Sequence, residues 1–527
     1  MDTPLKEKGN GGNAPDFTGR ERMIRNILSS WGGHMVFVVA GFVMPRMIDR
    51  HVGQVSLGIW DFSWSLVSYF GLASLGVGSS VNRYVAKLRA EGNREGLDEA
   101  VSSVVCVQVV VAAVVGLMTV AAVWFLPHFF KKIQGANLYE LRWVIALLGA
   151  SLAVQQMFDA FRGVMTGCHR WDLHNAISAI SYGITVILMI LVLSMGHGLR
   201  SMAAVYLATG IATEIYRYLA VRRICPELDL RYEKATWKQG KEMLSFGIKT
   251  VVVWLPPLII IQGSSLLIAR YLGPALLAVF SRPMGLIRSG QTFINKYALV
   301  LTPTAGSLQG AGLQGEIQDL VIRTTRYSVA LTLPMVLFLS ILGDPIMQVW
   351  MGPRYDAGRI MAILAVGSFL LMSQQSVITI LVGLNLHGPI GLVKIALSIV
   401  TMGIGVVALG VTGWSLAGAA ILVSVYTTAN GIAILLYACR KFDIPFGRYF
   451  RKSFLGPMAA GVPYGVALLV VNVTCRRTPL IALGAGCTVS LLVLGPIYWK
   501  YFFPAEIRGI FHRIPGFSGL AKAIGID

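Results

Sequence analysis

The chain has 527 residues, of which 55% are hydrophobic and only 13% are charged, and its mean hydropathy is +0.67. Because a soluble domain carries about 25% charged residues, this composition excludes an ordinary soluble protein and indicates a chain that crosses a membrane many times. The net charge of +20 does not require nucleic acid as a partner, since Lys and Arg hold the loops of membrane proteins on the cytoplasmic side.

The N-terminal residues 1–23 are rich in Gly and Asn and are predicted to form a disordered cytoplasmic tail. Fourteen apolar segments follow, each long enough for the roughly 20 helical residues that span a bilayer. We therefore predict an all-α polytopic membrane protein with about 14 transmembrane helices. The predicted spans are 26–45, 57–80, 101–126, 141–163, 173–195, 200–220, 245–269, 275–300, 321–342, 358–382, 389–410, 414–437, 454–473 and 479–501.

A sequence repeat relates the first and the seventh spans. Residues 47–60 read MIDRHVGQVSLGIW and residues 267–280 read LIARYLGPALLAVF, an offset of 220. Near the ends of spans 4 and 10, Gly167 and Gly383 correspond at a similar offset of 216. Because an even number of spans separates the copies, the two halves are predicted to be parallel six-helix repeats, followed by two C-terminal helices. The identical pairs in the first match are Ile48/Ile268, Arg50/Arg270, Gly53/Gly273 and Leu57/Leu277.

The repeat and the loops also predict the domain organisation. We expect an N-terminal six-helix bundle at 24–222, a basic cytoplasmic linker at 223–243 and a C-terminal six-helix bundle at 244–440. Residues 441–527 hold the two additional helices and a cytoplasmic tail. The loops and chain ends on the same side of the membrane as the linker hold about three times as many Lys and Arg residues as those on the other side. This asymmetry predicts a multi-pass protein of the cytoplasmic (inner) membrane with both termini in the cytoplasm.

Span 8 carries three cations, although a charge at the centre of a membrane helix costs about 2.5–3.5 kcal/mol. Arg288 shares a helical stripe with Gln291 and Asn295, and Arg282 and Lys296 lie on the neighbouring stripe. We expect this face to line a cavity and to bind an anionic headgroup, because the planar fork of arginine suits phosphate oxygens. The alternative is that Arg282 and Lys296 reach the membrane surfaces and that Arg288 pairs with a neighbouring acid.

Other charged residues near the predicted outer surface are candidates for the same site. Asp61 has no local partner in span 2, and it could face Arg46, Arg50 or Arg282 across a cavity mouth or be a simple interfacial acid. His34 lies within span 1, and the usual pKa of histidine would suit a proton-coupled step, with a structural histidine as the alternative. His34 and Asp61 are therefore the coupling candidates.

Two further acids each precede an arginine by three residues. These pairs are Asp159/Arg162 in span 4 and Glu214/Arg217 in span 6. Residues three apart are neighbours on a helix, so the spacing favours local ion pairs.

Helix-interrupting residues occur at corresponding places in the two halves. Span 1 contains Gly32 and Gly33, and span 7 contains Pro256 and Pro257. Interrupted helices at matching positions indicate a transport site and make these residues candidate hinges, with ordinary kinks as the alternative.

No catalytic constellation is found in the sequence. There is no Walker motif, no HExxH and no long external loop, and the six cysteines form neither a CxxC pair nor a Cys/His cluster. We therefore expect no enzymatic activity, no disulfide framework, no metal site and no cofactor.

Three sequence features together resemble a known group of transporters. They are the phrase R-x-x-G-x-x-x-L-G-x-W after span 1, the sequence SSVNRYVAK at 79–87, and Gly167, Arg170 and Asn175 at the end of span 4. With them, residues 24–440 resemble the polysaccharide flippases of the multidrug/oligosaccharidyl-lipid/polysaccharide exporter (MOP) superfamily. The resemblance implies a flippase that translocates a polyprenyl-diphosphate-linked oligosaccharide by alternating access, with lipid-linked glycan and membrane lipids as partners and no nucleic acid.

Three alternatives to this function stay open. A peptidoglycan lipid-precursor flippase would also suit fourteen spans and a cationic lining, but span 1 has no charge before Arg46, whereas that family places one deeper, so an exopolysaccharide or O-antigen unit is favoured. A cation-coupled multidrug exporter would need an acidic cavity, whereas span 8 is cationic. A non-transporting membrane scaffold would recruit polysaccharide-synthesis enzymes, which are further candidate partners in any case.

Overall fold

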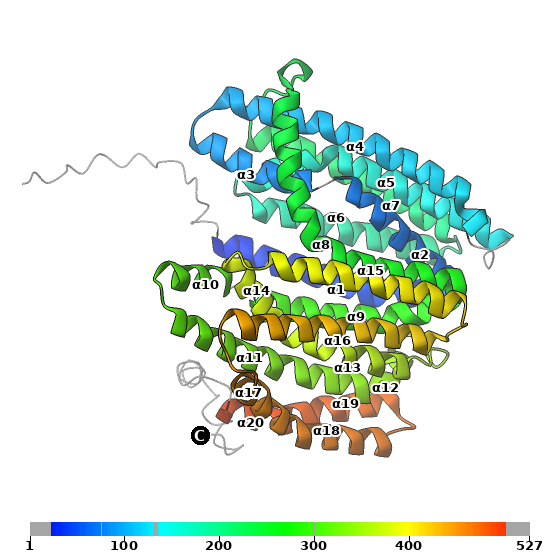
Figure 1. Ribbon diagram of the computed structural model, residues 1–527. Helices are drawn as coiled ribbons and strands as arrows, with labels where there is room; N and C mark the ends of the chain where they lie inside the picture. Colours follow the sequence, from blue (N-terminus) through cyan, green and yellow to red (C-terminus); the bar gives the residue numbers. More distant parts are fainter. Residues whose placement is uncertain (1–22, 75, 130–134, 299–300, 502–527) are drawn as a thin grey trace, which may run out of the picture. The chain divides into compact units, whose positions relative to one another are not determined.

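The structure is a computed structural model that describes residues 23–74, 76–129, 135–298 and 301–501. In these ranges every regular element is a helix, which confirms the predicted all-α class (Figure 1). The predicted N-terminal tail, apart from Met23, and the chain beyond residue 501 lie outside the described residues.

The helices follow the predicted spans in order, each span falling on one helix or on consecutive helices. In the first half they are α1 (Met23–Val52), α2 (Gln54–Phe70), α3 (Val77–Ala90), α4 (Arg94–Phe129), α5 (Ala136–Gly167), α6 (Trp171–Ser194) and α7 (Leu199–Ile224), with 3-10 turns at Gly71–Ser74 and Tyr232–Lys234. The next are α8 (Trp237–Tyr271), α9 (Pro274–Ala298), α10 (Leu301–Gly310), α11 (Gln314–Ile341), α12 (Gly343–Trp350), α13 (Gly358–Ser373), α14 (Gln375–Gly383), α15 (Gly388–Gly410) and α16 (Leu416–Lys441). The last are α17 (Phe446–Phe450), α18 (Gly456–Thr474), α19 (Pro479–Val489) and α20 (Gly495–Tyr501), with π-helical turns at Arg451–Leu455 and Ser490–Leu494.

Within the described residues, nine helical segments are long and apolar enough to cross a membrane. The helix α9 is not one of them, and Arg282, Arg288 and Lys296 lower its hydropathy. The chain is therefore a multi-pass membrane protein, and the count of about 14 spans stays a prediction.

The chain packs as two compact units, which are described separately. Unit 1 contains the described residues of 1–44, 70–124 and 142–251, and unit 2 contains those of 45–69, 125–141 and 252–527. The helix α2 belongs to unit 2, although the repeat places it in the first half of the sequence. In unit 2, α13 packs beside both α11 and α16, and α16 also contacts α15 (Figure 1).

The repeat is visible in the backbone. Gly53 and Gly273, at the offset of 220, have φ angles of 91° and 99°, which explains why glycine occupies both positions. At the offset of 216, His169 and Asn385 have φ angles of 55° and 56° and follow equivalent helix ends. Both turns are therefore left-handed at the same point of each half.

Helix packing repeats as well. In unit 1, a Cβ atom on Gly167 would lie 2.9 Å from the carbonyl oxygen of Asn82. In unit 2, a Cβ atom on Gly383 would lie 2.5 Å from the carbonyl oxygen of Thr302, which is the counterpart of Asn82. Small residues allow membrane helices to approach closely, so these glycines hold α5 to α3 and α14 to α10 in the same way.

Each unit has a buried apolar cluster built from equivalent helices. The equivalent buried residues are Val85/Ala305, Leu97/Ile317 and Val101/Val321 at the offset of 220, and Val164/Ile380, Met165/Leu381 and Leu228/Ile444 at the offset of 216. The two halves therefore share a fold and not only a short phrase.

The basic linker is ordered against unit 1. Asp98 of α4 accepts hydrogen bonds from the backbone N–H of Asp229 at 2.9 Å and from Lys234 Nζ at 2.7 Å. The hydrogen bond to Asp98 is the main cause that raises the pKa of Lys234 above its usual value. Thr236 is held by a further bond, from its N–H to Ser103 Oγ at 2.8 Å.

In unit 2 the two copies of the repeated phrase pack against each other. Gln54 Nε2 at the start of α2 donates a hydrogen bond to the carbonyl oxygen of Ala275 at 3.2 Å. A Cβ atom on Gly58 would lie only 1.8 Å from the carbonyl oxygen of Pro274. The crossing of α2 and α9 is therefore as close as two backbones allow, and only glycine fits at position 58.

Candidate functional site

The helix α9 presents different faces to the core and to a cavity. Leu277 and Ile294 are buried among neighbouring helices. Arg288, Gln291 and Asn295 line a cavity of about 270 Å³ within unit 2. The structure thus brings together the three residues that helical spacing places on one stripe.

The other walls of this cavity come from α8, α13, α14, α15 and α16. Pro256 and Pro257 of α8 line it, together with Lys394 of α15 and Tyr426 and Asn430 of α16. We call it the cationic cavity, because Arg288 and Lys394 are its charged residues and no Asp or Glu is among the described residues that line it.

Arg288 and Lys394 also lack protein counter-ions. Within the described part of the chain, neither side chain makes an ion pair or a hydrogen bond, and Arg288 is exposed in the open cavity. Ionisable residues inside membrane segments usually pair with each other or mark a substrate path. Two unpaired cations without a lining acid therefore favour an anionic ligand.

Amide oxygens add acceptors to this cationic surface. Asn430 is only 1% exposed, and its Nδ2 donates to the carbonyl oxygen of Tyr426 at 3.0 Å. The Oδ1 atoms of Asn430 and Asn295 are buried and have no hydrogen-bond partner among the described residues. An unsatisfied buried acceptor costs about 1–3 kcal/mol, so a hydroxyl or water that donates here would be stabilising.

Sequence analysis did not single out Lys394, which lies near the start of predicted span 11. The repeat could have indicated Lys394. At the offset of 216, Lys394 corresponds to Ser178, and Ser178 lines a cavity of unit 1. A search for cations at positions equivalent to polar residues of the other half would have found it.

Arg282 does not line the cationic cavity, because it is paired elsewhere in unit 2. Its Nη2 atom donates to both carboxylate oxygens of Asp61, at 2.5 Å from Oδ1. The side chains are only 7% and 15% exposed. Of the three arginines considered for Asp61, the structure pairs it with Arg282, at the crossing of α2 and α9.

The remaining candidates lie outside the cationic cavity. Arg46 and Arg50 are exposed at the end of α1, and a Cβ atom on Gly352 would lie 2.8 Å from Arg46 Nη1. Lys296 and His34 are half-buried and do not line this cavity. Their proposed roles in binding or coupling stay predictions.

The candidate hinges lie within continuous helices. The helix α1 continues through Gly32 and Gly33, and α8 continues through Pro256 and Pro257. Only the proline pair lines the cationic cavity. A hinge function for either pair stays a prediction.

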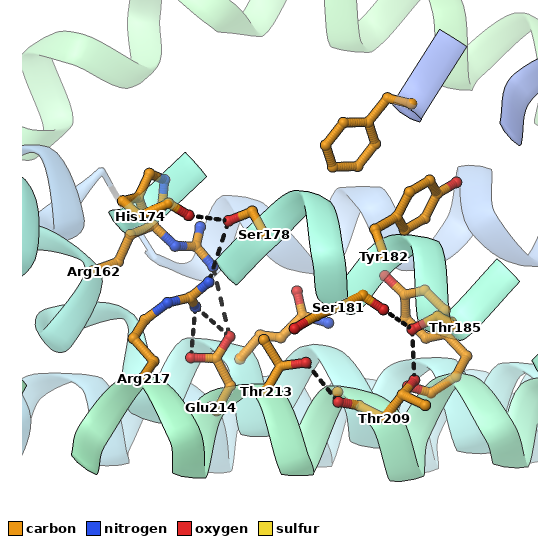
Figure 2. Close-up of a pocket in the computed structure, with 14 residues that line it drawn as sticks. Arg162, His174, Ser178, Ser181, Tyr182, Thr185, Thr209, Thr213, Glu214 and Arg217 are labelled. Atoms are coloured by element: carbon orange, nitrogen blue, oxygen red, sulfur yellow. Dashed lines mark hydrogen bonds and ion pairs between the residues drawn. The ribbon is translucent and has the colours of Figure 1, made fainter. Parts of the chain in front are cut away.

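A second cavity, of about 280 Å³, lies inside unit 1 (Figure 2). Its walls come from α5, α6 and α7, with Phe37 of α1 stacked on Tyr182 at 4.4 Å between ring centroids. We call it the hydroxyl-lined cavity, because side-chain hydroxyls and one amide predominate. These residues are Gln155, Ser178, Ser181, Thr185, Thr209 and Thr213.

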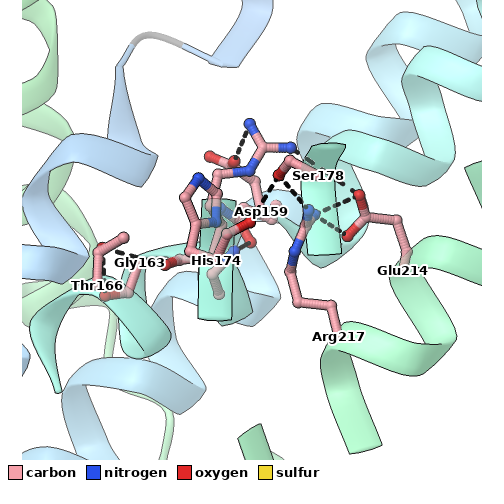
Figure 3. Close-up of polar contacts among 10 residues, drawn as sticks. Asp159, Gly163, Thr166, His174, Ser178, Glu214 and Arg217 are labelled. Carbon is pink, nitrogen blue, oxygen red and sulfur yellow. Dashed lines mark hydrogen bonds and ion pairs between the residues drawn. The ribbon is translucent and has the colours of Figure 1, made fainter. Parts of the chain in front are cut away.

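An ion-pair network contributes Arg162, Glu214 and Arg217 to the lining of the hydroxyl-lined cavity, and Figure 3 shows its contacts. Arg217 Nη1 donates to both oxygens of Glu214, at 2.5 and 2.7 Å, and its Nη2 contacts Ser178 Oγ at 3.4 Å. Arg162 lies 3.3 Å from Asp159 and 3.9 Å from Glu214. The two predicted local ion pairs are confirmed, and Arg162 joins them into one network.

The two cavities occupy equivalent places in the repeat. Lining residues that correspond at the offset of 216 are Gln155/Leu371, Arg162/Ile378, Ser178/Lys394, Gly210/Tyr426 and Glu214/Asn430. Unit 1 thus has an arginine and a glutamate where unit 2 has an isoleucine and an asparagine. The equivalent cavities therefore differ in charge, because acids accompany the arginines in unit 1 and no acid is among the described residues that line the cavity of unit 2.

Helical repeats that each hold a polar cavity are typical of the class of membrane transporters. A family model described as polysaccharide biosynthesis protein matches residues 91–358, which is just over half of the chain. The chain therefore belongs to this family.

The chain is also similar to individual proteins. The chain is 20% identical over 443 residues to the uncharacterized membrane protein EpsK of Bacillus subtilis (strain 168), covering 80% of this chain and 83% of EpsK. It superposes on an inward-facing multidrug resistance MATE family transporter of the MOP superfamily with a TM-score of 0.67, at 14% identity, covering 77% of this chain and 94% of that one. For the inward closed conformation of the lipid II flippase MurJ, the TM-score is 0.66 at 12% identity, covering 90% and 99%. These similarities confirm the predicted MOP-superfamily fold.

Proposed function

We propose that this protein is a flippase that moves a polyprenyl-diphosphate-linked oligosaccharide, an exopolysaccharide or O-antigen unit, across the cytoplasmic membrane by alternating access. The observation that carries the proposal is the cationic cavity, in which Arg288 and Lys394 have no protein counter-ion among the described residues. Membership of a polysaccharide biosynthesis family supports a glycan as the cargo.

The sign of the charge separates this function from multidrug export. A cationic ligand held about 4 Å from either Arg288 or Lys394 would be repelled by about 4 kcal/mol at an effective dielectric constant of about 20. A diphosphate would be attracted by a similar amount, and arginine binds its oxygens through two parallel N–H groups. The MATE-like fold therefore carries a cavity of the wrong polarity for organic cations.

The chemistry of the proposed substrate also matches the other lining groups. A lipid-linked glycan has an apolar tail that stays in the bilayer, an anionic diphosphate, and sugars that need hydrogen bonds. The amide residues Gln291 and Asn295 line the same cavity and offer polar groups to sugar hydroxyls beside the cations that would hold the diphosphate. We expect the protein to translocate its substrate without changing it chemically. We also expect both termini of the protein to lie in the cytoplasm.

The test is the lipid-linked glycan content of a strain that lacks this protein, measured by thin-layer chromatography and mass spectrometry. We expect a diphosphate-linked oligosaccharide to accumulate on the cytoplasmic side, wild-type protein to clear it, and Arg288→Ala to leave it in place at a normal protein level. Arg323→Ala is the matched control, because Arg323 is an exposed arginine of unit 2 that lies 3.8 Å from Glu316 and does not line the cavity.

Each alternative function gives a different result in the same strain. Accumulation of a peptide-bearing peptidoglycan precursor would identify the protein as a lipid II flippase. New sensitivity to cationic dyes without lipid accumulation would identify a multidrug exporter. Full clearance by Arg288→Ala would contradict the cationic cavity as the binding site. A strain without lipid accumulation and without dye sensitivity would favour a scaffold role.

A further inference from the structure

The proposed function places the diphosphate in the cationic cavity of unit 2 and gives the hydroxyl-lined cavity of unit 1 no role. Its charges cancel, since Arg162 and Arg217 are matched by Asp159 and Glu214 in one network. The buried pair Arg217–Glu214 is only 3–4% exposed, so an incoming phosphate would have to displace a well-held carboxylate. This cavity therefore does not favour a second anion.

What the cavity offers instead is hydrogen bonding from fixed positions. Ser181 and Thr213 line it from two helices (Figure 2). Gln155 adds an amide from a third helix. The hydroxyl of Thr213 donates to the carbonyl oxygen of Thr209 at 2.6 Å, so its oxygen can still accept a hydrogen bond from a ligand that carries many hydroxyls. The stacked rings of Phe37 and Tyr182 supply an apolar surface against which the C–H face of a sugar ring can pack.

Buried donors in the network are also left without partners. Arg217 is only 3% exposed, and its Nε atom makes no hydrogen bond to the described chain. Arg162 Nε and His174 Nδ1 are likewise buried atoms without a hydrogen-bond partner in the described chain, and both residues line the cavity. Buried polar groups are usually satisfied, and these exceptions cluster at the wall of this cavity.

From these features we propose that the hydroxyl-lined cavity of unit 1 binds an uncharged sugar residue of the translocated glycan. This inference rests on the proposed function and deepens it. The volume of about 280 Å³ lies near the lower end of small-ligand pockets, which suits one sugar residue better than a whole oligosaccharide.

The experiment compares two probes on the purified full-length protein. One is farnesyl diphosphate, and the other is the lipid-linked oligosaccharide extracted from the strain that lacks the protein. The test variant combines Gln155→Leu, Ser181→Ala and Thr213→Val, which removes polar groups from the wall and leaves the ion network intact. Gln155→Leu installs the residue found at the equivalent position, Leu371. The control is Ser201→Ala, a hydroxyl of α7 outside the cavity.

We expect the triple variant to bind farnesyl diphosphate like wild type and to bind the glycosylated lipid at least about tenfold more weakly, since three hydrogen bonds of about 0.5–1.5 kcal/mol each are lost. Lys394→Gln is expected to weaken the binding of both probes. These two patterns separate the sugar site from the diphosphate site.

Other outcomes overturn one statement or both. Unchanged binding of the glycosylated lipid by the triple variant would overturn the sugar site and leave the flippase proposal standing. An equal loss for both probes would show that the wall is structural and would also overturn the sugar site. If wild-type protein binds neither probe, the proposed function fails and the sugar site fails with it.

Discussion

Neutralising Asp61 is the perturbation that most clearly separates a structural charge from a transporting one. The side chain of Arg282 is only 7% exposed. In Asp61→Asn it stays buried but loses the carboxylate that accepts its hydrogen bonds. Removing one partner of a buried ion pair costs about 3–5 kcal/mol, because the other charge is left uncompensated. We expect the free energy of unfolding to fall by about that amount.

The same reasoning predicts that the second substitution repairs the first. In Asp61→Asn combined with Arg282→Gln, two neutral amides can hydrogen-bond in place of the ion pair, and no buried charge remains. Detergent titration of the purified protein, followed by tryptophan fluorescence, gives the free energy of unfolding of each variant. The double variant is expected to be more stable than either single variant, with a coupling energy above about 1 kcal/mol.

Transport adds a second readout to this cycle. Because Arg282 does not line the cationic cavity, the double variant is expected to clear lipid-linked glycan once it is folded. Strictly additive stability losses would refute the pairing. An Arg282→Gln variant that unfolds like wild type but transports nothing would show that Arg282 binds substrate, as the stripe pattern of span 8 alone suggests.

Further substitutions test other parts of the account. Lys394→Gln is expected to block clearance of the lipid-linked glycan at normal protein abundance, measured by extraction and mass spectrometry. Arg288→Lys keeps the charge but loses the bidentate fork, so clearance is expected to fall between that of wild type and that of Arg288→Ala. Gly58→Leu should abolish folded protein, measured by size-exclusion chromatography, since even a Cβ atom at this position would lie 1.8 Å from the carbonyl oxygen of Pro274.

Much of the fold can be predicted from three patterns in the sequence: apolar segments, an internal repeat and a polar stripe. Long apolar segments predict the helices, because a bilayer leaves the backbone few other choices. The phrase around Gly53 and Gly273 predicts the repeat, and the structure shows that both glycines adopt the positive φ that their turn requires. The polar stripe of α9 predicts that Arg288, Gln291 and Asn295 share one surface.

What the sequence could not show is which helices meet. Helical spacing groups Arg282 with Lys296, but the contact that decides the role of Arg282 comes from α2, more than 200 residues away. Lys394 enters the cavity from α15 in the same way. Local periodicity describes one helix at a time, whereas charge compensation depends on its neighbours. The repeat relates Lys394 to Ser178, a polar residue of the first half, and this equivalence could have pointed to Lys394 from the sequence.

The most direct test of the cationic cavity is transbilayer movement in liposomes that contain the purified protein and a fluorescent farnesyl-diphosphate-linked glycan. Quenching by an added reductant reports the fraction of probe in the outer leaflet over time. The account predicts rapid movement with wild-type protein and movement at the protein-free rate with Arg288→Ala at equal incorporation. Equal rates for wild type and Arg288→Ala would contradict the claim that this cavity carries the diphosphate.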